Sequence, residues 1–224
     1  MLSYAWLIIW LPLLGFLFNA LSGFIFKDKK TQKTMVGIIA PGVVLVAFGI
    51  AVMVLLELNG LPKPRQVVGM FPSFLPWGSP ESAWIEMPGQ FRVNFGLLLD
   101  PLSMLMTLIV TGIGGLIHIY AVGYMKEDAE QPRFFTYFNL FIFMMLLLVL
   151  GENFLLMFVG WEGVGSCSYL LISFWYTTTE NAKAGNKAFI VNRVGDLGFA
   201  LGMMAIWSLF GTLSYFCLLY TSPS

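Results

Sequence analysis

Long apolar segments recur along the chain, and each has the length of a membrane-spanning helix. A helix needs about 20 apolar residues to cross the hydrocarbon core of a bilayer. Charged residues are missing from the first two segments and rare in the last two. We therefore predict six membrane helices, at Tyr4–Phe26, Thr34–Leu56, Pro101–Met125, Phe134–Gly151, Asn153–Thr179 and Ala188–Phe216.

The composition excludes a soluble globular protein. Of the 224 residues, 58% are hydrophobic and only 11% are charged, whereas soluble domains carry about 25% charged residues. The 12 basic and 12 acidic residues give a net charge of zero, so the chain lacks the basic stripe that nucleic-acid binding requires. We predict an all-α, polytopic transmembrane helix bundle in contact with the lipid bilayer.

Basic residues are distributed unevenly over the loops between the predicted helices. Short loops that carry more lysine and arginine stay in the cytoplasm. Eight such residues lie in the loops after the first, third and fifth helices, and three lie on the opposite side. This bias predicts that the N-terminus is outside and that Glu57 and Glu152, at helix ends on that outer side, face solvent. The eight residues are Lys27, Lys29, Lys30, Lys33, Lys126, Arg133, Lys183 and Lys187.

The only long connection, residues 59–96, lies on the predicted outer face. It contains six of the eleven prolines, which excludes a continuous helix. Residues 84–95 are predicted to form a β-hairpin around Pro88-Gly89, because Phe91, Val93 and Phe95 alternate with polar residues. The apolar face of that hairpin needs a neighbour in this chain or another subunit. Asp100-Pro101 is typical of a helix start, with Asp100 as N-cap.

Glu162 lies about nine residues into the fifth predicted helix. Inserting a carboxylate there costs at least about 2.5–3.5 kcal/mol, so such a residue is by default a candidate site. Gly165, Ser166 and Tyr169 share its helix face and form a small polar strip. The functional interpretation is a proton carrier, and the alternative is a structural carboxylate capped by hydroxyl groups.

Arg193 and Asp196 are three residues apart in the sixth predicted helix and therefore share a face. One interpretation is a structural ion pair, since a pair is less costly to bury than either charge alone. The other is that the pair tunes Glu162: arginine favours the carboxylate, and burial favours the neutral acid. A proton relay needs such opposed effects.

Other candidates are weaker. Lys187 is either a topology anchor or part of an input path, and His118 either joins a hydrogen-bonded chain or is a packing residue. A single histidine, with only Cys167 and Cys217 besides, is too few ligands for a metal or haem site. The glycines at 112–115 and 163–165 follow no strand, so we interpret them as close helix contacts rather than nucleotide loops. Any redox cofactor must lie in partner subunits.

Several runs resemble the antiporter-like chain 5 family of respiratory complex I, whose bacterial members are subunit L of NADH-quinone oxidoreductase. The similarity covers essentially residues 1–216, and the Trp-Glu-Gly and Asn-Arg-Val-Gly-Asp motifs are quite specific. The matching runs are Asp100-Pro-Leu-Ser103, Ile117-His-Ile-Tyr120, Gly123-Tyr-Met125, Phe134–Phe141, Val159–Gly165, Ser168–Ile172 and Lys187–Asp196.

The resemblance implies a proton-translocating subunit, working with other membrane subunits of complex I in a bacterial-type plasma membrane. NADH, FMN, iron–sulfur clusters and quinone would be bound by partner subunits. Glu162 would be the essential glutamate of the first half-channel, and Arg193 and Asp196 the charged pair beside it. The family completes the half-channel with a lysine on the next helix and a second, inverted repeat. We find neither here, so this piece alone is expected to be inactive.

The expected organisation is a first helix pair at 1–58, the outer loop at 59–96, and the start of the translocating region at 97–216. Residues 217–224 depart from the family pattern, and we expect a truncated or foreign end there. Two alternatives remain open. One is the large subunit of a multisubunit Na+/H+ antiporter or a hydrogenase-linked homologue, and the other is a purely structural membrane scaffold.

Overall fold

Residues 4–60, 68–70, 84–87, 91–215 and 217–218 are described by the computed structural model. Within them, six helices are long and apolar enough to cross a membrane, as the sequence predicts. They are α1 (Trp6–Ile25), α2 (Lys29–Asn59), α3 (Pro101–Tyr124), α4 (Gln131–Leu150), α5 (Phe154–Ile172) and α6 (Thr179–Phe210).

The largest errors in the predicted boundaries concern the last two helices. α5 ends at Ile172, and α6 begins at Thr179, nine residues before the predicted start. The extra turns of α6 are polar, and they are stabilised by an i,i+3 ion pair between Glu180 and Lys183 at 3.3 Å. We predicted that this helix runs on to Phe216, but it stops at Phe210. Gly211 there adopts a left-handed conformation with φ 69°, which ends helices favourably at glycine.

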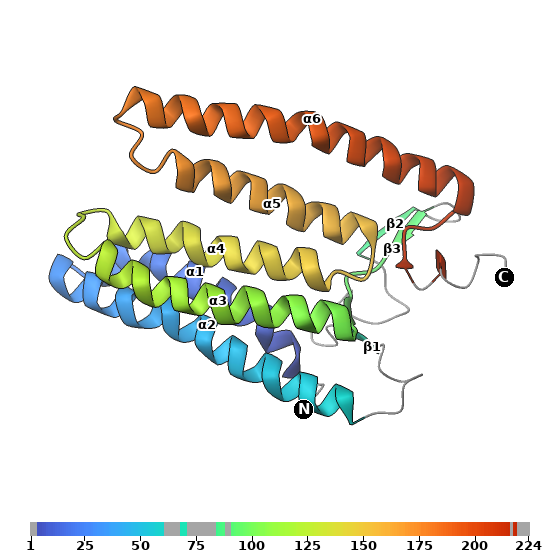
Figure 1. The fold of residues 1–224 in the computed structure, drawn as a ribbon, viewed down its shortest axis with the longest axis horizontal. Coiled ribbons are helices and arrows are strands. Elements are labelled where there is room, and N and C mark those ends of the chain that lie inside the picture. Colours follow the sequence, from blue (N-terminus) through green and yellow to red (C-terminus); the bar gives the residue numbers. More distant parts are fainter. Residues whose placement is uncertain (1–3, 61–67, 71–83, 88–90, 216, 219–224) are drawn as a thin grey trace.

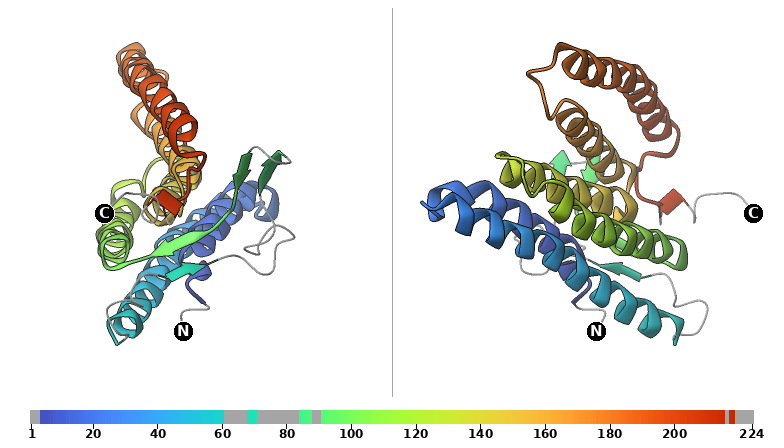
Figure 2. Two further views of the ribbon diagram at one scale, coloured as in Figure 1. Left: turned by 90° about the vertical axis from the view of Figure 1, so that its right-hand side faces the viewer. Right: turned by 60° about the vertical axis from the view of Figure 1, so that its left-hand side comes forward.

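The helices lie roughly side by side, and α6 is at the edge of the group (Figure 1). α1 packs against α2 and α4, α5 packs along α4, and α6 packs along α5. Figure 2 shows the α5–α6 pair extending away from α1 and α2. The connections at 26–28, 125–130 and 173–178 lie at one end, and the strands lie at the other. This is the alternation that a multi-pass chain requires.

Glycines allow the helices to approach closely. A Cβ at Gly160 of α5 would lie 2.5 Å from the backbone nitrogen of Leu148 in α4. A Cβ at Gly115 of α3 would lie 2.8 Å from the Leu45 side chain of α2. The interpretation of the glycines at 112–115 as helix contacts is therefore confirmed at Gly115, and Gly160 makes a contact of the same kind that the sequence did not single out. At both positions a larger residue would push the helices apart.

Four short strands lie at the end of the bundle opposite to the short connections. β1 (Val68–Met70) pairs antiparallel with β4 (Leu97–Leu99), a pairing that the sequence did not predict. β2 (Ile85–Met87) pairs antiparallel with β3 (Phe91–Val93). The turn Pro88-Gly89 lies outside the described residues, so the complete hairpin stays a prediction.

The segment that follows β3 packs on this chain. Val93 is buried, and the Phe95 ring stacks on Trp6 of α1 at 6.2 Å and meets Trp84 at 5.8 Å. The neighbour that this apolar segment requires is therefore α1. The predicted cap is confirmed as well: the Asp100 carboxylate accepts a hydrogen bond from the Ser103 backbone nitrogen, and the Ser103 hydroxyl oxygen accepts one from the Asp100 backbone nitrogen.

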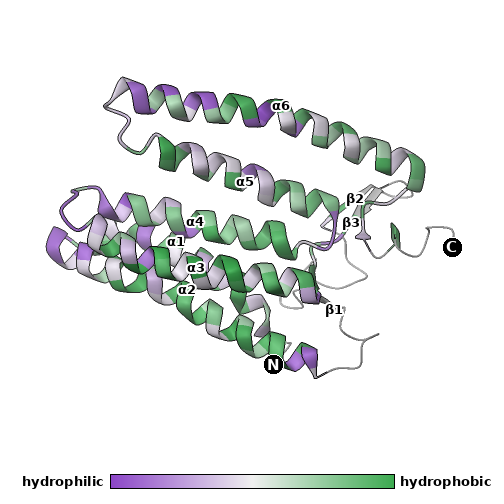
Figure 3. Cartoon of the chain, viewed as in Figure 1, coloured by the Kyte–Doolittle hydropathy of each residue, from purple (hydrophilic) through white to green (hydrophobic). Residues whose placement is uncertain are grey.

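Hydropathy varies along the helices as expected of a membrane protein (Figure 3). The helices are largely apolar, and the connections at one end are hydrophilic. The first half of α6 is the exception, because it carries hydrophilic turns within the length of the bundle. That half contains Lys187 and Arg193, and Asp196 lies just past the middle of the helix.

Candidate functional site

An ion pair joins α5 to α6 near the middle of both helices. Nη1 of Arg193 in α6 donates to Oε2 of Glu162 in α5. The Glu162 side chain is 23% exposed and that of Arg193 is 44% exposed. The structure thus brings together two of the residues that the sequence selected, and it gives Glu162 a cationic partner instead of a cap of hydroxyl groups.

A second carboxylate lies close to the same guanidinium. Oδ2 of Asp196 is 3.9 Å from Nη1 of Arg193, at the limit of an ion pair. Asp196 is only 7% exposed, and its Oδ1 accepts a 2.9 Å hydrogen bond from the Trp161 indole nitrogen. The sequence predicted that Arg193 and Asp196 pair with each other, whereas the closer partner of Arg193 is Glu162. One guanidinium therefore serves two carboxylates.

Aromatic rings enclose this charged cluster. The Arg193 guanidinium lies over the Phe189 ring, 4.6 Å from its centroid, a cation–π arrangement. Phe199 stacks with Phe158 at 5.4 Å and with Trp161 at 6.4 Å. Rings on these sides reduce the contact of the charges with other polar groups, which strengthens the electrostatic interactions within the cluster.

Sequence reasoning missed Trp161 and Phe189. Both belong to the quoted motifs, but an aromatic residue in a membrane helix is normally taken as lipid-facing or packing. A signal did exist: Phe189 lies four residues before Arg193, which places it on the same helix face. The Trp161 bond to Asp196 connects two helices, and no spacing within one helix predicts it.

Lys187 does not join the cluster. Its side chain is exposed, six residues before Arg193 in α6, which corresponds to about 9 Å along the helix axis. Residues six apart also point in different directions around a helix. The geometry therefore fits an anchor near the membrane surface better than a direct contact with Glu162.

His118 lies elsewhere, on α3, and is fully buried. Its Nδ1 is 2.8 Å from the Gly114 carbonyl oxygen, and its Nε2 is 2.9 Å from Oδ1 of Asn139 in α4. The Phe138 ring stacks on the imidazole at 3.9 Å. Both interpretations from the sequence apply, since the ring is hydrogen-bonded and packed, and these contacts are with α3 and α4 rather than with the Glu162 cluster.

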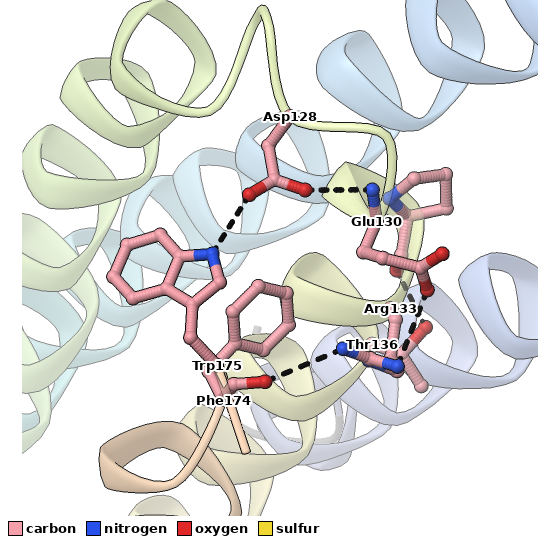
Figure 4. A network of polar contacts seen from close by, with 7 residues as sticks. Asp128, Glu130, Arg133, Thr136, Phe174 and Trp175 are labelled. Carbon is pink, nitrogen blue, oxygen red and sulfur yellow. Dashed lines mark hydrogen bonds and ion pairs between the residues drawn. The ribbon is translucent and has the colours of Figure 1, made fainter. Parts of the chain in front are cut away.

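A polar network closes the bundle at the end where the short connections lie (Figure 4). Arg133 of α4 pairs with Glu130 at 3.3 Å and donates a 3.3 Å hydrogen bond to the Phe174 carbonyl oxygen beyond α5. Asp128 accepts from the Glu130 backbone nitrogen at 2.8 Å and from the Trp175 indole at 2.9 Å. These bonds hold the pKa of Asp128 below its ordinary value. The network ties the α3–α4 connection to the end of α5.

Glu152, between α4 and α5 at the opposite end, contradicts the expectation that it faces solvent. It is 3% exposed, and burial raises its pKa to about 7. Its backbone nitrogen donates to Gly96 and its carbonyl accepts from Tyr215. These two backbone hydrogen bonds hold Glu152 between the segments at Gly96 and Tyr215, so it does not face water.

Among the described residues, no three histidine, cysteine, aspartate or glutamate side chains gather in a way that would hold a metal ion. Both cysteines are free, Cys167 buried and Cys217 exposed. Within the described part of the chain, the cluster around Glu162 is an arrangement of charged side chains and aromatic rings.

Two family models match the chain. Residues 84–135 match the N-terminus of NADH-ubiquinone oxidoreductase (complex I) chain 5, and residues 151–222 match the transmembrane family of NADH:quinone oxidoreductase and Mrp antiporters. His118 lies in the first match, and Glu162, Arg193 and Asp196 lie in the second.

The same likeness appears in whole proteins. NADH-quinone oxidoreductase subunit L of Mycobacterium tuberculosis is 43% identical over 212 residues, which are 95% of this chain and 31% of that protein. Subunit L of Escherichia coli is 48% identical over 139 residues, 62% of this chain and 22% of that protein. The resemblance inferred from the motifs is confirmed. The chain spans about a third, or less, of the length of these relatives.

A solved structure shares the fold. A chain in the membrane-bound sulfane sulfur reductase, an archaeal respiratory membrane complex, aligns with a TM-score of 0.71 at 17% identity. The alignment covers 97% of this chain and 40% of that one. The arrangement of the six helices is therefore one that a respiratory membrane complex is known to contain.

Proposed function

We propose that this chain is the amino-terminal part of a proton-translocating membrane subunit of an NADH:quinone oxidoreductase, similar to subunit L and chain 5. Electron transfer in partner subunits, which would hold NADH, FMN, iron–sulfur clusters and quinone, drives proton movement through the membrane charges of this subunit. Residues 97–216 supply the first part of the translocating region. The pairing of Glu162 with Arg193 at the middle of α5 and α6 is the observation that carries this proposal.

In this mechanism Arg193 exchanges between two carboxylates. While the guanidinium contacts Glu162, that carboxylate stays charged. When the guanidinium moves toward Asp196, 3.9 Å away, Glu162 loses its counter-charge and takes up a proton, because an isolated charge is costly in the membrane. Trp161 holds Asp196 in place as the alternative acceptor. Moving one charge against 100 mV costs about 2.3 kcal/mol, so the exchange must alter the site energies by a comparable amount.

The loop charges support an orientation of the chain for this transport. Helix ends rich in lysine and arginine face the cytoplasm, so the proposed orientation has the end with the network of Figure 4 inside and the strands outside. Protons would enter from the inner end and leave at the outer one. The next carrier after Glu162 would be a basic residue on helices outside the printed chain, as the family resemblance implies.

The test is Glu162→Gln in the full-length protein within its complex, reconstituted into vesicles. We expect normal assembly and a reduced ratio of protons pumped to NADH oxidised. Glu180→Gln is the matched control, since Glu180 is an exposed glutamate of α6 that pairs only at the surface with Lys183; it should leave the ratio unchanged. An unaltered ratio in Glu162→Gln would remove Glu162 from the mechanism.

The same experiment separates the alternatives. A structural scaffold predicts that Glu162→Gln impairs assembly while whatever assembles pumps normally. An Na+/H+ antiporter subunit predicts transport that depends on sodium and needs no NADH. The match of residues 151–222 includes Mrp antiporters, which is the observation that keeps this second candidate in view.

A further inference from the structure

A second set of buried polar side chains lies in the part of the bundle formed by α1, α3 and α4. Asn19 of α1 is 2% exposed, and His118 of α3 and Asn139 of α4 are fully buried. Buried polar groups are normally fully hydrogen-bonded. Two atoms of this set, Oδ1 of Asn19 and Nδ2 of Asn139, have no hydrogen-bond partner within the described part of the chain. A purely structural role does not require these two atoms to lack a hydrogen-bond partner.

The contacts of His118 define its protonation. The Gly114 carbonyl oxygen can only accept, so Nδ1, 2.8 Å away, carries a hydrogen. Nε2 faces Oδ1 of Asn139 at 2.9 Å, and this oxygen also only accepts. With the amide oxygen facing the ring in this way, Nε2 would also have to carry a hydrogen, and the ring would be an imidazolium cation.

The same contact has a second hydrogen-bonding state. If the Asn139 amide turns over, its NH2 group donates to Nε2, and the ring is then neutral with its single hydrogen on Nδ1. Protonation of His118 is therefore coupled to the orientation of one amide. The other end of that amide faces α1 at Gly15, where an added Cβ would clash with Nδ2. Only glycine leaves room for the amide end there.

The groups around His118 do not fix its ring in either the protonated or the neutral state. The Phe138 ring, parallel to the imidazole at 3.9 Å, presents a π face that attracts a cation. The packed helices offer no carboxylate that the structure joins to the ring. α1 has no charged residue, α3 has none besides the histidine, α4 has Arg133 and the phenol Tyr137, and α3 ends with Tyr120 and Tyr124. α2 has Lys29, Lys30 and Lys33 in its first turns and Glu57 near its end.

A pocket approaches one member of this set, Asn19, from the end of the bundle with the short connections. A pocket of about 440 Å3 opens there, lined by Asn19 together with Gln32, Lys33, Arg133 and Thr136. Asn19 donates to the Phe135 carbonyl oxygen, one helical turn before Asn139. The two vacancies, on Asn19 and Asn139, thus lie about one turn apart at the α1–α4 contact. A water molecule needs such partners to occupy a buried site.

We propose that His118 and Asn139 form a proton-binding site inside the membrane, separate from the Glu162 cluster and supplied through the pocket at Asn19. A hydronium ion reaching the site transfers its proton to Nε2 and leaves a water molecule, and the Asn139 amide turns to accept the new N–H. Release reverses both steps. The contacts of His118 are with α3 and α4, whereas those of Glu162 are with α6.

The test is nitrogen-15 NMR of histidine in the full-length protein within its complex, in lipid. His118 is the single histidine of the printed chain, and subtracting the spectrum of His118→Gln isolates its signal from histidines elsewhere. We expect the ring to pass from one protonated nitrogen to two as the pH falls from about 8 to about 5. A ring that keeps one state over this range overturns the proposal.

Asn139→Asp tests the coupling to the amide. A carboxylate only accepts hydrogen bonds, so it should raise the midpoint of the titration by at least about one pH unit, a tenfold gain in proton affinity. The control is Asn181→Asp, which changes a half-buried asparagine at the start of α6 and should leave the midpoint in place. A titration that Asn139→Asp does not move would also overturn the proposal, because the amide would then have no part in it.

Discussion

The indole nitrogen of Trp161 donates a 2.9 Å hydrogen bond across the α5–α6 contact to Asp196. This bond fixes the position of the carboxylate that competes with Glu162 for Arg193. Trp161 directly precedes Glu162 in the sequence. The same turn of α5 therefore carries one carboxylate of the cluster and hydrogen-bonds the other, Asp196. The separation between Arg193 and Asp196 depends on that contact.

Trp161→Phe should therefore weaken transport. Phenylalanine keeps a ring for stacking on Phe199 but lacks the N–H, and a hydrogen bond to a charged group contributes about 1.5–3 kcal/mol. Asp196 would then compete more strongly for the Arg193 guanidinium, and the ion pair between Glu162 and Arg193 would weaken. We expect assembly of the complex and a several-fold lower rate of proton pumping, measured in vesicles.

The matched control is Trp175→Phe. Trp175 donates an indole hydrogen bond of the same 2.9 Å length to Asp128, but at the surface network and far from the cluster. It should leave pumping nearly unchanged. Equal losses in both variants would show that the Trp161 bond has no special part in transport.

The helices and the charged cluster were accessible from sequence for physical reasons. Apolar length alone predicts membrane helices, and the cost of a buried charge singles out Glu162, Arg193 and Asp196. The partner of each charge was not accessible, because pairing between α5 and α6 depends on how two helices dock. The i,i+3 spacing suggested Arg193 with Asp196, and the docking placed Glu162 closer.

The burial of Glu152 shows a second limit. A charged residue between two helices is normally solvated, and its neighbours in sequence predict nothing else. It is buried because segments distant in sequence, at Gly96 and Tyr215, bond to its backbone from both sides. Similarly, the sequence did not predict that α6 begins at Thr179, because its first turns are polar and lack an apolar pattern.

Gly160→Ala should destabilise the contact between α4 and α5. The added Cβ would lie 2.5 Å from the Leu148 backbone nitrogen, and a backbone atom cannot move away without shifting the helix. Overpacking of this kind costs about 1–3 kcal/mol. Thermal unfolding in detergent should show a lower midpoint than wild type.

Gly49→Ala is the control for this substitution. Gly49 lies inside α2 with nothing within 4 Å of an added Cβ, so only helix propensity changes, and alanine is favoured there by up to about 1 kcal/mol. Its midpoint should equal or exceed that of wild type. If Gly160→Ala behaved in the same way, α5 would not approach α4 at Leu148 as closely as described.

Glu152 should make stability depend on pH. Its pKa is raised from 4.5 to about 7 by burial, so the folded state holds a proton between these values that the unfolded state has lost. Stability is then fully present below about pH 4.5, falls as the pH rises toward 7, and stays lower above it. At about 1.4 kcal/mol per pKa unit, the loss is on the order of 3 kcal/mol. Thermal unfolding of the wild-type chain at pH 5 and pH 8 measures it.

Glu152→Gln should remove most of this dependence, since glutamine cannot ionise and fills nearly the same volume. Glu127→Gln changes an exposed glutamate in the α3–α4 connection and should retain the wild-type profile. Because the backbone of Glu152 joins Gly96 to Tyr215, ionisation should loosen this junction first. Hydrogen exchange at the amides of Glu152 and Tyr215 should therefore accelerate between pH 5 and pH 8 beyond the intrinsic rate increase, and an equal acceleration in Glu152→Gln would rule out this carboxyl group as the cause.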